Sequence, residues 1–153
     1  MVNTDSELPC SRVIPTTTYS LNWKLVLNPN FNFFRSMIGL VNGLVDPLFS
    51  NAPAETIMFV GYGGKRTFLW SPDTGATTVT PWDLTFKFVG RHINSESVVF
   101  TPGAKTGVAG VAGWNHVFRP ATGNWERPVK ADKKYLYDST TTWGQMFRTG
   151  GLL

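Results

Sequence analysis

The stretch Pro81-Trp82-Asp83-Leu84-Thr85-Phe86-Lys87-Phe88 alternates large apolar residues with polar ones at a period of two. Successive side chains of a β-strand point to opposite faces of a sheet, so the apolar set would share one face and the polar set the other. The apolar set is Trp82, Leu84, Phe86 and Phe88, and the polar set is Asp83, Thr85 and Lys87. The stretch therefore predicts a strand with one dry face and one face in water.

Other short segments of the chain show strand patterns, with turn residues between them. They are residues 21–27, 56–62, 66–71, 113–119 and 134–138. Gly63-Gly64-Lys65 predicts a hairpin turn between the second and third of these. Strands that recur at short intervals are typical of sandwiches and barrels. We therefore expect a mainly β fold, an antiparallel β-sandwich or barrel, in a single domain over residues 21–153.

One segment follows a helical period instead. Phe34, Ile38, Val41 and Val45 are spaced i, i+4, i+7 and i+11. This spacing predicts one short α-helix over about residues 32–43, with Asn32 as its N-cap. The segment from Ser139 to Phe147 fits either a helical turn or a docked strand.

Two segments lack a packing pattern. Residues 1–20 are polar and contain Pro9 and Pro15, which predicts an extended N-terminal arm. Residues 101–110 are glycine-rich and predict a mobile loop. In an assembly, both segments could become ordered against a neighbouring subunit.

Composition limits the classes of partner. Charged residues make up 16% of the chain, against about 25% in an average soluble domain, and aromatic residues make up 14%. Such a chain has either a surface covered by a partner or an aromatic-rich core. The net charge is +4, but the basic residues are dispersed, and the densest region, residues 119–134, also contains acids. We therefore expect no specific nucleic-acid site.

The chain also shows no sign of secretion or membrane insertion. Cys10 is the single cysteine, so no intrachain disulfide can form, which fits folding in a reducing cytoplasm. The first residues do not form a secretory signal, and no apolar run reaches the length of a membrane span.

The usual catalytic patterns are missing. Gly61 to Arg66 looks like a phosphate loop only superficially, because Gly64-Lys65 is not followed by Ser or Thr. His92 and His116 stand outside any metal-ligand spacing, and Cys10 has no neighbouring base. We expect no enzyme, no cofactor and no metal. A β-rich enzyme built on one of the histidines and an acid is the weakest of the alternatives left open.

The aromatic residues suggest a different use. Trp114, Trp125, Tyr135 and Tyr137 are the candidates for an interface. On a wet sheet face they could stack on sugar rings, which would make the chain a carbohydrate-binding module. Alternatively, they fill the core or a subunit interface, where Trp and Tyr are enriched, and this second use is favoured.

Four landmarks, taken in order, resemble a group of small β-rich structural proteins encoded by tailed phages and prophage-like gene clusters. They are Gly43–Phe49 leading into Glu55–Gly61, then Trp82–Phe88, then Gly113–Arg119, and finally Val129-Lys130 leading into Tyr135–Tyr137. The resemblance covers roughly residues 34–147, excludes the arm and carries no catalytic residues.

The resemblance implies a virion structural protein that self-assembles into a ring or shell with other virion proteins. A head–tail neck, a connector or a minor capsid component would fit. Such a subunit would fold and assemble in the host cytoplasm and reside in the virion. Its mildly basic charge would suit a lumen that passes DNA without gripping it.

Overall fold

The computed structural model describes residues 16–66, 69–70, 77–78, 81–94, 98–99, 110–128 and 135–153. Within these residues the fold is mainly β, as predicted. Residues 1–15 of the predicted arm, residues 101–109 of the predicted loop and residues 129–134 of the basic region lie outside the described residues.

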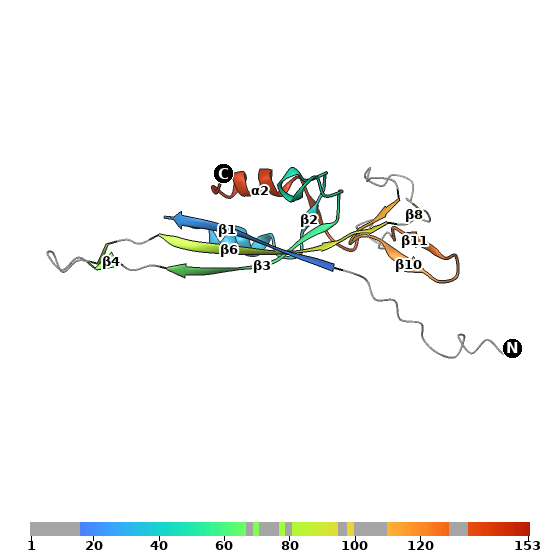
Figure 1. The fold of residues 1–153 in the computed structure, drawn as a ribbon, viewed down its shortest axis with the longest axis horizontal. Helices are drawn as coiled ribbons and strands as arrows, with labels where there is room; N and C mark the ends of the chain where they lie inside the picture. The colour runs from blue at the N-terminus through green and yellow to red at the C-terminus, as the bar shows by residue number, and fades with distance from the viewer. Residues whose placement is uncertain are drawn as a thin grey trace, which may run out of the picture.

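The largest sheet has five strands in the order β1-β6-β3-β2-β12 (Figure 1). These strands are β1 (Thr16–Val26), β6 (Trp82–Arg91), β3 (Ile57–Arg66), β2 (Val41–Asn42) and β12 (Ser139–Thr140). All neighbours are antiparallel except β2 and β12, which run parallel. The long strand β6 is paired along both sides, by β1 and by β3.

Smaller sheets lie toward the two ends of the molecule (Figure 1). At one end are β10 (Val117–Arg119), β11 (Asn124–Glu126) and β8 (Val98–Val99), together with β7 (Ile93–Asn94) paired with β9 (Val111–Ala112). At the other end β4 (Leu69–Trp70) pairs with β5 (Thr77–Thr78). The helical elements are α1 (Phe31–Ser36), the 3-10 turn η2 (Pro47–Phe49) and α2 (Trp143–Thr149). No helix of the described residues is long and apolar enough to cross a membrane.

Strand β6 has the two faces that its sequence predicts. Leu84, Phe86 and Phe88 are buried, whereas Lys87 on the opposite face is exposed. On that wet face Thr85 Oγ1 donates to Asn22 Oδ1 of β1 at 2.8 Å. The alternation therefore specifies correctly which side of the sheet carries the core.

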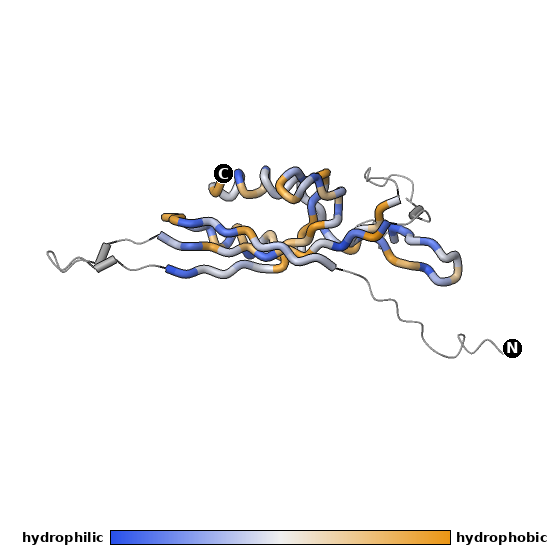
Figure 2. Tube along the Cα trace, in the orientation of Figure 1, coloured by the Kyte–Doolittle hydropathy of each residue, from blue (hydrophilic) through white to orange (hydrophobic). Residues whose placement is uncertain are grey.

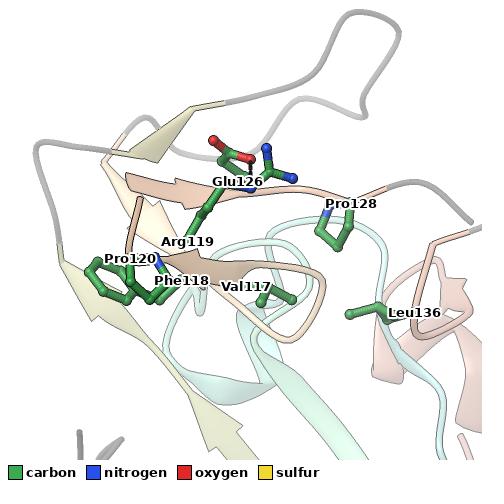
Figure 3. Close-up of a pocket in the computed structure, with 7 residues that line it drawn as sticks. All are labelled: Val117, Phe118, Arg119, Pro120, Glu126, Pro128 and Leu136. Carbon is green, nitrogen blue, oxygen red and sulfur yellow. Dashed lines mark ion pairs between the residues drawn. The ribbon is translucent and has the colours of Figure 1, made fainter. Parts of the chain in front are cut away.

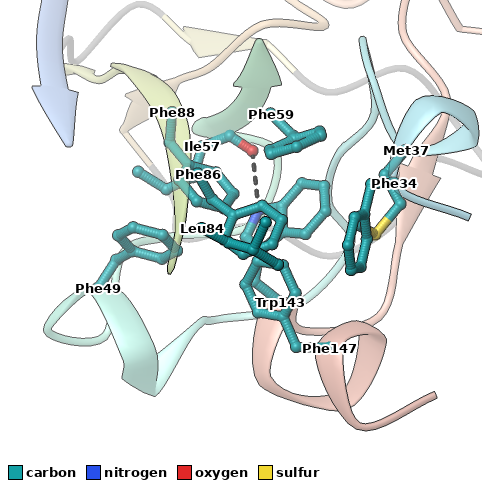
Figure 4. Close-up of a cluster of buried hydrophobic side chains, with 10 residues drawn as sticks. All are labelled: Phe34, Met37, Phe49, Ile57, Phe59, Leu84, Phe86, Phe88, Trp143 and Phe147. Atoms are coloured by element: carbon teal, nitrogen blue, oxygen red, sulfur yellow. Dashed lines mark hydrogen bonds between the residues drawn. The ribbon is translucent and has the colours of Figure 1, made fainter. Parts of the chain in front are cut away.

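Helical elements cover the dry face of the five-stranded sheet (Figure 4). Phe86 contacts Phe34 of α1 and Phe147 of α2, in each case with ring centroids 5.1 Å apart. Phe88 contacts Phe49 of η2 at 4.8 Å and Trp143 of α2 at 5.2 Å. Edge-to-face and tilted ring packing of this kind accounts for much of the high aromatic content of the chain.

A buried carboxylate joins two of the covering elements. Asp46 caps η2 by accepting from Leu48 N–H at 3.1 Å, and its other oxygen accepts from Trp143 N–H at the start of α2 at 2.7 Å. Burial raises the pKa of Asp46, while these two backbone hydrogen bonds act in the opposite direction. The covering layer is therefore held by a specific polar contact as well as by aromatic packing.

The sandwich or barrel is not observed. No sheet of the described residues closes into a barrel. The core side of the largest sheet packs against α1, η2 and α2, so a sandwich is not confirmed. The long connections after β2 and β3 return the chain to the sheet through helical turns and small sheets. The alternation of residues along a single strand does not predict such connections.

Three predicted boundaries also change. The helix expected over residues 32–43 ends at Ser36 and is capped by Asn30, whose side chain accepts from Phe33 N–H. Val41 lies instead in β2, beyond Gly39 with its positive φ of 88°. Residues 16–20 of the predicted arm belong to β1, because they pair with β6.

The hairpin turn predicted at Gly63-Gly64-Lys65 is wrong. Strand β3 runs through these residues, and Gly64 lies opposite Leu84 of β6. A Cβ atom at Gly64 would come within 3.1 Å of the side chains of Leu84 and Trp82. Gly64 therefore allows close packing within a strand and does not mark a reversal of the chain.

Candidate functional site

The four aromatic residues predicted as an interface lie around two arginine side chains at the β9–β11 end of the molecule. The guanidinium of Arg91 lies 5.8 Å from the ring centre of Trp114 and 5.6 Å from that of Trp125. The guanidinium of Arg127 lies 5.1 Å from the ring centre of Tyr135. Tyr137 completes the group, with its ring 5.6 Å from Trp114. The structure thus brings together residues that are far apart in the sequence.

The two tryptophans of this group have packing roles. Trp125 is only 2% exposed and contacts Phe118 at a ring distance of 5.4 Å. Trp114 is partly buried, and its indole N–H donates to the carbonyl oxygens of Thr56 at 3.0 Å and Val89 at 3.3 Å. These contacts fasten the segment before β10 to Thr56, directly before β3, and to strand β6. Trp125 therefore presents no open face for sugar stacking, and the indole N–H of Trp114 is already used within the chain.

A buried ion pair lies beneath the aromatic rings. Arg127 Nη2 donates to Glu55 Oε2, and both side chains are 1% exposed. Glu55 has a positive φ of 64°, and its carbonyl oxygen accepts from Trp114 N–H at 2.8 Å. A Cβ atom at Gly113 would lie 2.4 Å from that same carbonyl oxygen. Gly113 is therefore needed for the close approach of the two backbones.

His116 is buried in the same cluster. Its Nδ1 accepts from Gly113 N–H at 3.1 Å, and its carbonyl oxygen accepts from Arg91 Nη2 at 3.2 Å. Burial, together with the smaller effect of the positive charges of Arg127 and Arg91, lowers the pKa of His116 to about 4. Burial also lowers the pKa of Arg91. The imidazole is therefore neutral at pH 7 and is not accessible as a catalytic base.

The loop that carries Tyr135 and Tyr137 is held by an asparagine. Asn115 is buried; its Oδ1 accepts from Tyr137 N–H at 2.8 Å and its Nδ2 donates to the carbonyl oxygen of Tyr137 at 3.2 Å. This two-way hydrogen bond connects residues 22 positions apart. It fixes the position of Tyr137, which lies just before β12 in the chain.

A pocket lies on the β10–β11 hairpin that this cluster supports (Figure 3). Its volume is about 280 Å³, and its apolar walls are Val117, Phe118, Pro120, Pro128 and Leu136. An ion pair between Arg119 Nε and Glu126 Oε2, 3.0 Å long, also lines it. Two of the wall residues, Val117 and Leu136, are 44% and 39% exposed. The pocket is therefore open to an apolar group from outside.

The pocket walls are mostly apolar, and the two charged residues that line it, Arg119 and Glu126, are paired with each other. The described residues contain no group of three or more His, Cys, Asp or Glu side chains that could hold a metal ion. His92, the other histidine, is exposed and lies 3.0 Å from Asn94 Oδ1. The arrangement can accept an apolar side chain and can position the ion pair of Arg119 and Glu126 beside it.

Sequence reasoning found the aromatic residues but missed the charged centre. Glu55 and Arg127 are 72 positions apart, and neither lies in a pattern that marks a buried charge. A weak signal was Gly113 directly before Trp114, since a glycine next to a large aromatic residue is consistent with a close approach of two backbones.

No protein-family model matches the chain, and no similar protein was found among curated proteins or among solved structures.

Proposed function

We propose that this protein is a self-assembling structural subunit of a bacteriophage virion, in a ring or shell such as a head–tail neck, a connector or a minor capsid layer. It would assemble in the host cytoplasm and contact other copies of itself and other virion proteins. The observation that carries the proposal is the outer edge of β1.

Strand β1 is the outermost strand of its sheet among the described residues. It pairs with β6 on one side only, in regular register from Thr16 to Trp23. Along the other side, the backbone N–H and C=O groups of an edge strand are available to another strand. A regular edge of this length can add a strand from a second molecule.

The sequence of this edge lacks the residues that usually protect one. Thr16 to Trp23 contains no charged residue and no proline. Monomeric β proteins commonly protect their edges with Lys, Pro or a bulge. In β1, Lys24 and a bulge between Trp23 and Val26 appear only at the C-terminal end. The unprotected part is thus the part that a second copy would cover.

Other features of the chain are compatible with assembly through the edge of β1. The dry face of the sheet is already occupied by α1, η2 and α2, so strand addition extends the sheet without displacing its core. The net charge of +4 is compatible with passive contact to DNA in a lumen. The resemblance of residues 34–147 to phage structural proteins points to the same class.

The carbohydrate-binding alternative has less support. It needs exposed aromatic faces, yet Trp125 is buried and the indole N–H of Trp114 donates to two carbonyl oxygens of the chain itself. Catalysis by His116 has no support from its burial and lowered pKa.

The proposal is tested by measuring molar mass with light scattering over a range of protein concentrations. The wild-type protein is expected to form oligomers, and the double variant Thr18→Glu/Ser20→Glu is expected to shift toward monomer. Both positions are exposed on β1, and Ser20 lies opposite Lys87, so the new carboxylates have no like-charged partner there. A wild-type protein that stays monomeric at the highest concentration contradicts the proposal.

A matched control adds the same charge away from the edge. Asn32→Glu and Thr141→Glu are both at exposed positions outside β1, so this double variant should assemble as the wild type does. Equal loss of assembly in both double variants would attribute the effect to net charge and not to the edge.

A further inference from the structure

The C-terminal end of β1 carries an unusual leucine. Leu25 is 72% exposed, the most exposed of the large hydrophobic residues described, and its backbone has a positive φ of 61°. It lies in the bulge where the pairing of β1 with β6 shifts, and its N–H donates to Asp83 Oδ1 at 3.3 Å. Leu27 beside it is 62% exposed. Figure 2 shows this end of β1 coloured as hydrophobic.

Both features of Leu25 are unfavourable in an isolated subunit. The left-handed backbone region suits Gly or Asn, whereas other side chains occupy it under strain. A leucine also gains nothing from projecting into water. Strained residues that persist in a structure often have a functional reason. A glycine at this position would relieve the backbone, so the feature that leucine adds is its protruding apolar side chain.

The pocket on β10–β11 offers an apolar hollow that an exposed apolar side chain can fill. It has apolar walls and a volume of about 280 Å³, just below the range of about 300–1,000 Å³ that is typical of small-molecule sites. The apolar walls, rather than the volume, favour an aliphatic side chain over a sugar, because buried sugar hydroxyls need hydrogen-bond partners. The open walls, Val117 and Leu136, leave room for a side chain to enter from outside.

The two surfaces lie at opposite ends of the molecule. The C-terminal end of β1 is at one end of the long axis, and β10 and β11 are at the other (Figure 1). The Leu25 side chain therefore cannot reach the pocket of its own subunit. If the two surfaces meet, they meet between two copies of the chain.

We propose that the Leu25 bulge of one copy inserts into the β10–β11 pocket of the next copy. This inference rests on the proposed function and specifies one mode of the self-association. The two contacting surfaces differ, so the contact is heterologous, and repeating it produces a closed ring or an open filament. It is distinct from the β1 edge, which lies N-terminal to the bulge.

Mixed single-cysteine variants test the contact directly. In a Cys10→Ser background, one sample carries Leu25→Cys and a second, with a different affinity tag, carries Val117→Cys. A short bis-maleimide is added to each sample alone and to the mixture. We expect a cross-linked dimer that contains both tags in the mixture, and little cross-linking in either sample alone.

Other cross-linking patterns overturn the inference. Efficient Leu25→Cys to Leu25→Cys cross-links would indicate an isologous contact instead. A mixture that cross-links no better than Thr141→Cys with Val117→Cys would remove the contact altogether, since Thr141 is exposed but belongs neither to the bulge nor to the pocket walls. If light scattering still shows oligomers in that case, the proposed function stands and only this contact fails.

A substitution that favours folding provides the second test. Leu25→Gly suits the positive φ, so the melting temperature of the monomeric form should stay the same or rise. At the same time the oligomeric fraction should fall, because the inserted side chain is lost. Leu44→Gly, at another exposed leucine (55%), should leave the oligomeric fraction unchanged. Oligomers of Leu25→Gly as abundant as those of the wild type would contradict the inference.

Discussion

The core beneath the five-stranded sheet and the cluster at β9–β11 are both rich in aromatic residues, but they are stabilised differently. In the sheet core, Phe86 and Phe88 pack against rings from α1, η2 and α2. In the cluster, the rings surround Arg91 and Arg127 and a buried carboxylate. The sheet core depends mainly on ring packing, whereas the cluster also depends on keeping charges paired. The difference predicts distinct responses to mutation and to pH.

Removing the central ring of the sheet core should have the largest effect. Phe86 is fully buried, and Phe86→Ala is expected to lower the free energy of unfolding by about 4 kcal/mol, from lost burial and an unfilled cavity. Chemical denaturation would measure this loss, which should be the same at pH 5 and pH 7 because the substitution adds and removes no charge. A loss below about 1 kcal/mol would mean that the region does not depend on packing.

Breaking the buried ion pair should come next. Arg127→Met leaves the Glu55 carboxylate without its cation, and we expect a loss of about 3 kcal/mol. The double variant Arg127→Met/Glu55→Gln removes both charges and should recover part of that loss in the same denaturation assay. If the double variant loses as much stability again relative to Arg127→Met, the charges of Arg127 and Glu55 are not coupled as the structure indicates.

These two regions also differ in how far the sequence predicts them. The alternation of residues 82–88 identifies the buried face of β6 because a strand repeats every two residues. No comparable local rule connects Glu55 with Arg127, or Asn115 with Tyr137, since these contacts depend on how distant segments return to the sheet. The aromatic candidates were therefore recognisable from the sequence, while the charges that organise them were not.

The errors along the chain have local causes. The helical spacing of Phe34, Ile38 and Val41 was misleading, because Ile38 is exposed and Val41 is in β2. Asn42 stabilises that short strand from a buried position, accepting from Thr56 N–H and Ile57 N–H. Residues 16–20 have the polar composition of an arm, yet they pair with β6, because threonine is a good strand residue.

Acid should destabilise the charged cluster through His116. Its folded pKa of about 4 lies below the unfolded value of about 6.5, so the unfolded state binds more protons between these pH values. Stability is therefore lost as the pH falls, by about 2 kcal/mol between pH 7 and pH 4.5 for this residue. Denaturation curves of wild type and His116→Asn at both pH values isolate the contribution, because an asparagine oxygen can still accept from Gly113 N–H. Equal pH dependence in the two proteins would show that His116 does not contribute it.

The smallest of these effects is expected from the close backbone approach at Gly113. A Cβ atom there meets the Glu55 carbonyl oxygen at 2.4 Å, so Gly113→Ala should cost about 1–2 kcal/mol as the cluster shifts. Gly61→Ala is the control, because nothing lies within 4 Å of a Cβ at that position. Thermal unfolding of both variants would measure the difference, and equal melting temperatures would argue against the tight contact.

The most direct test of self-assembly is amide hydrogen exchange of β1 at low and at high protein concentration. The account predicts that Thr16 to Trp23 become more protected at the higher concentration, while β6, already paired on both sides, changes little. Protection in β1 that is the same at both concentrations, in a sample that light scattering shows to be oligomeric, would contradict the claim that copies of this chain join through that edge.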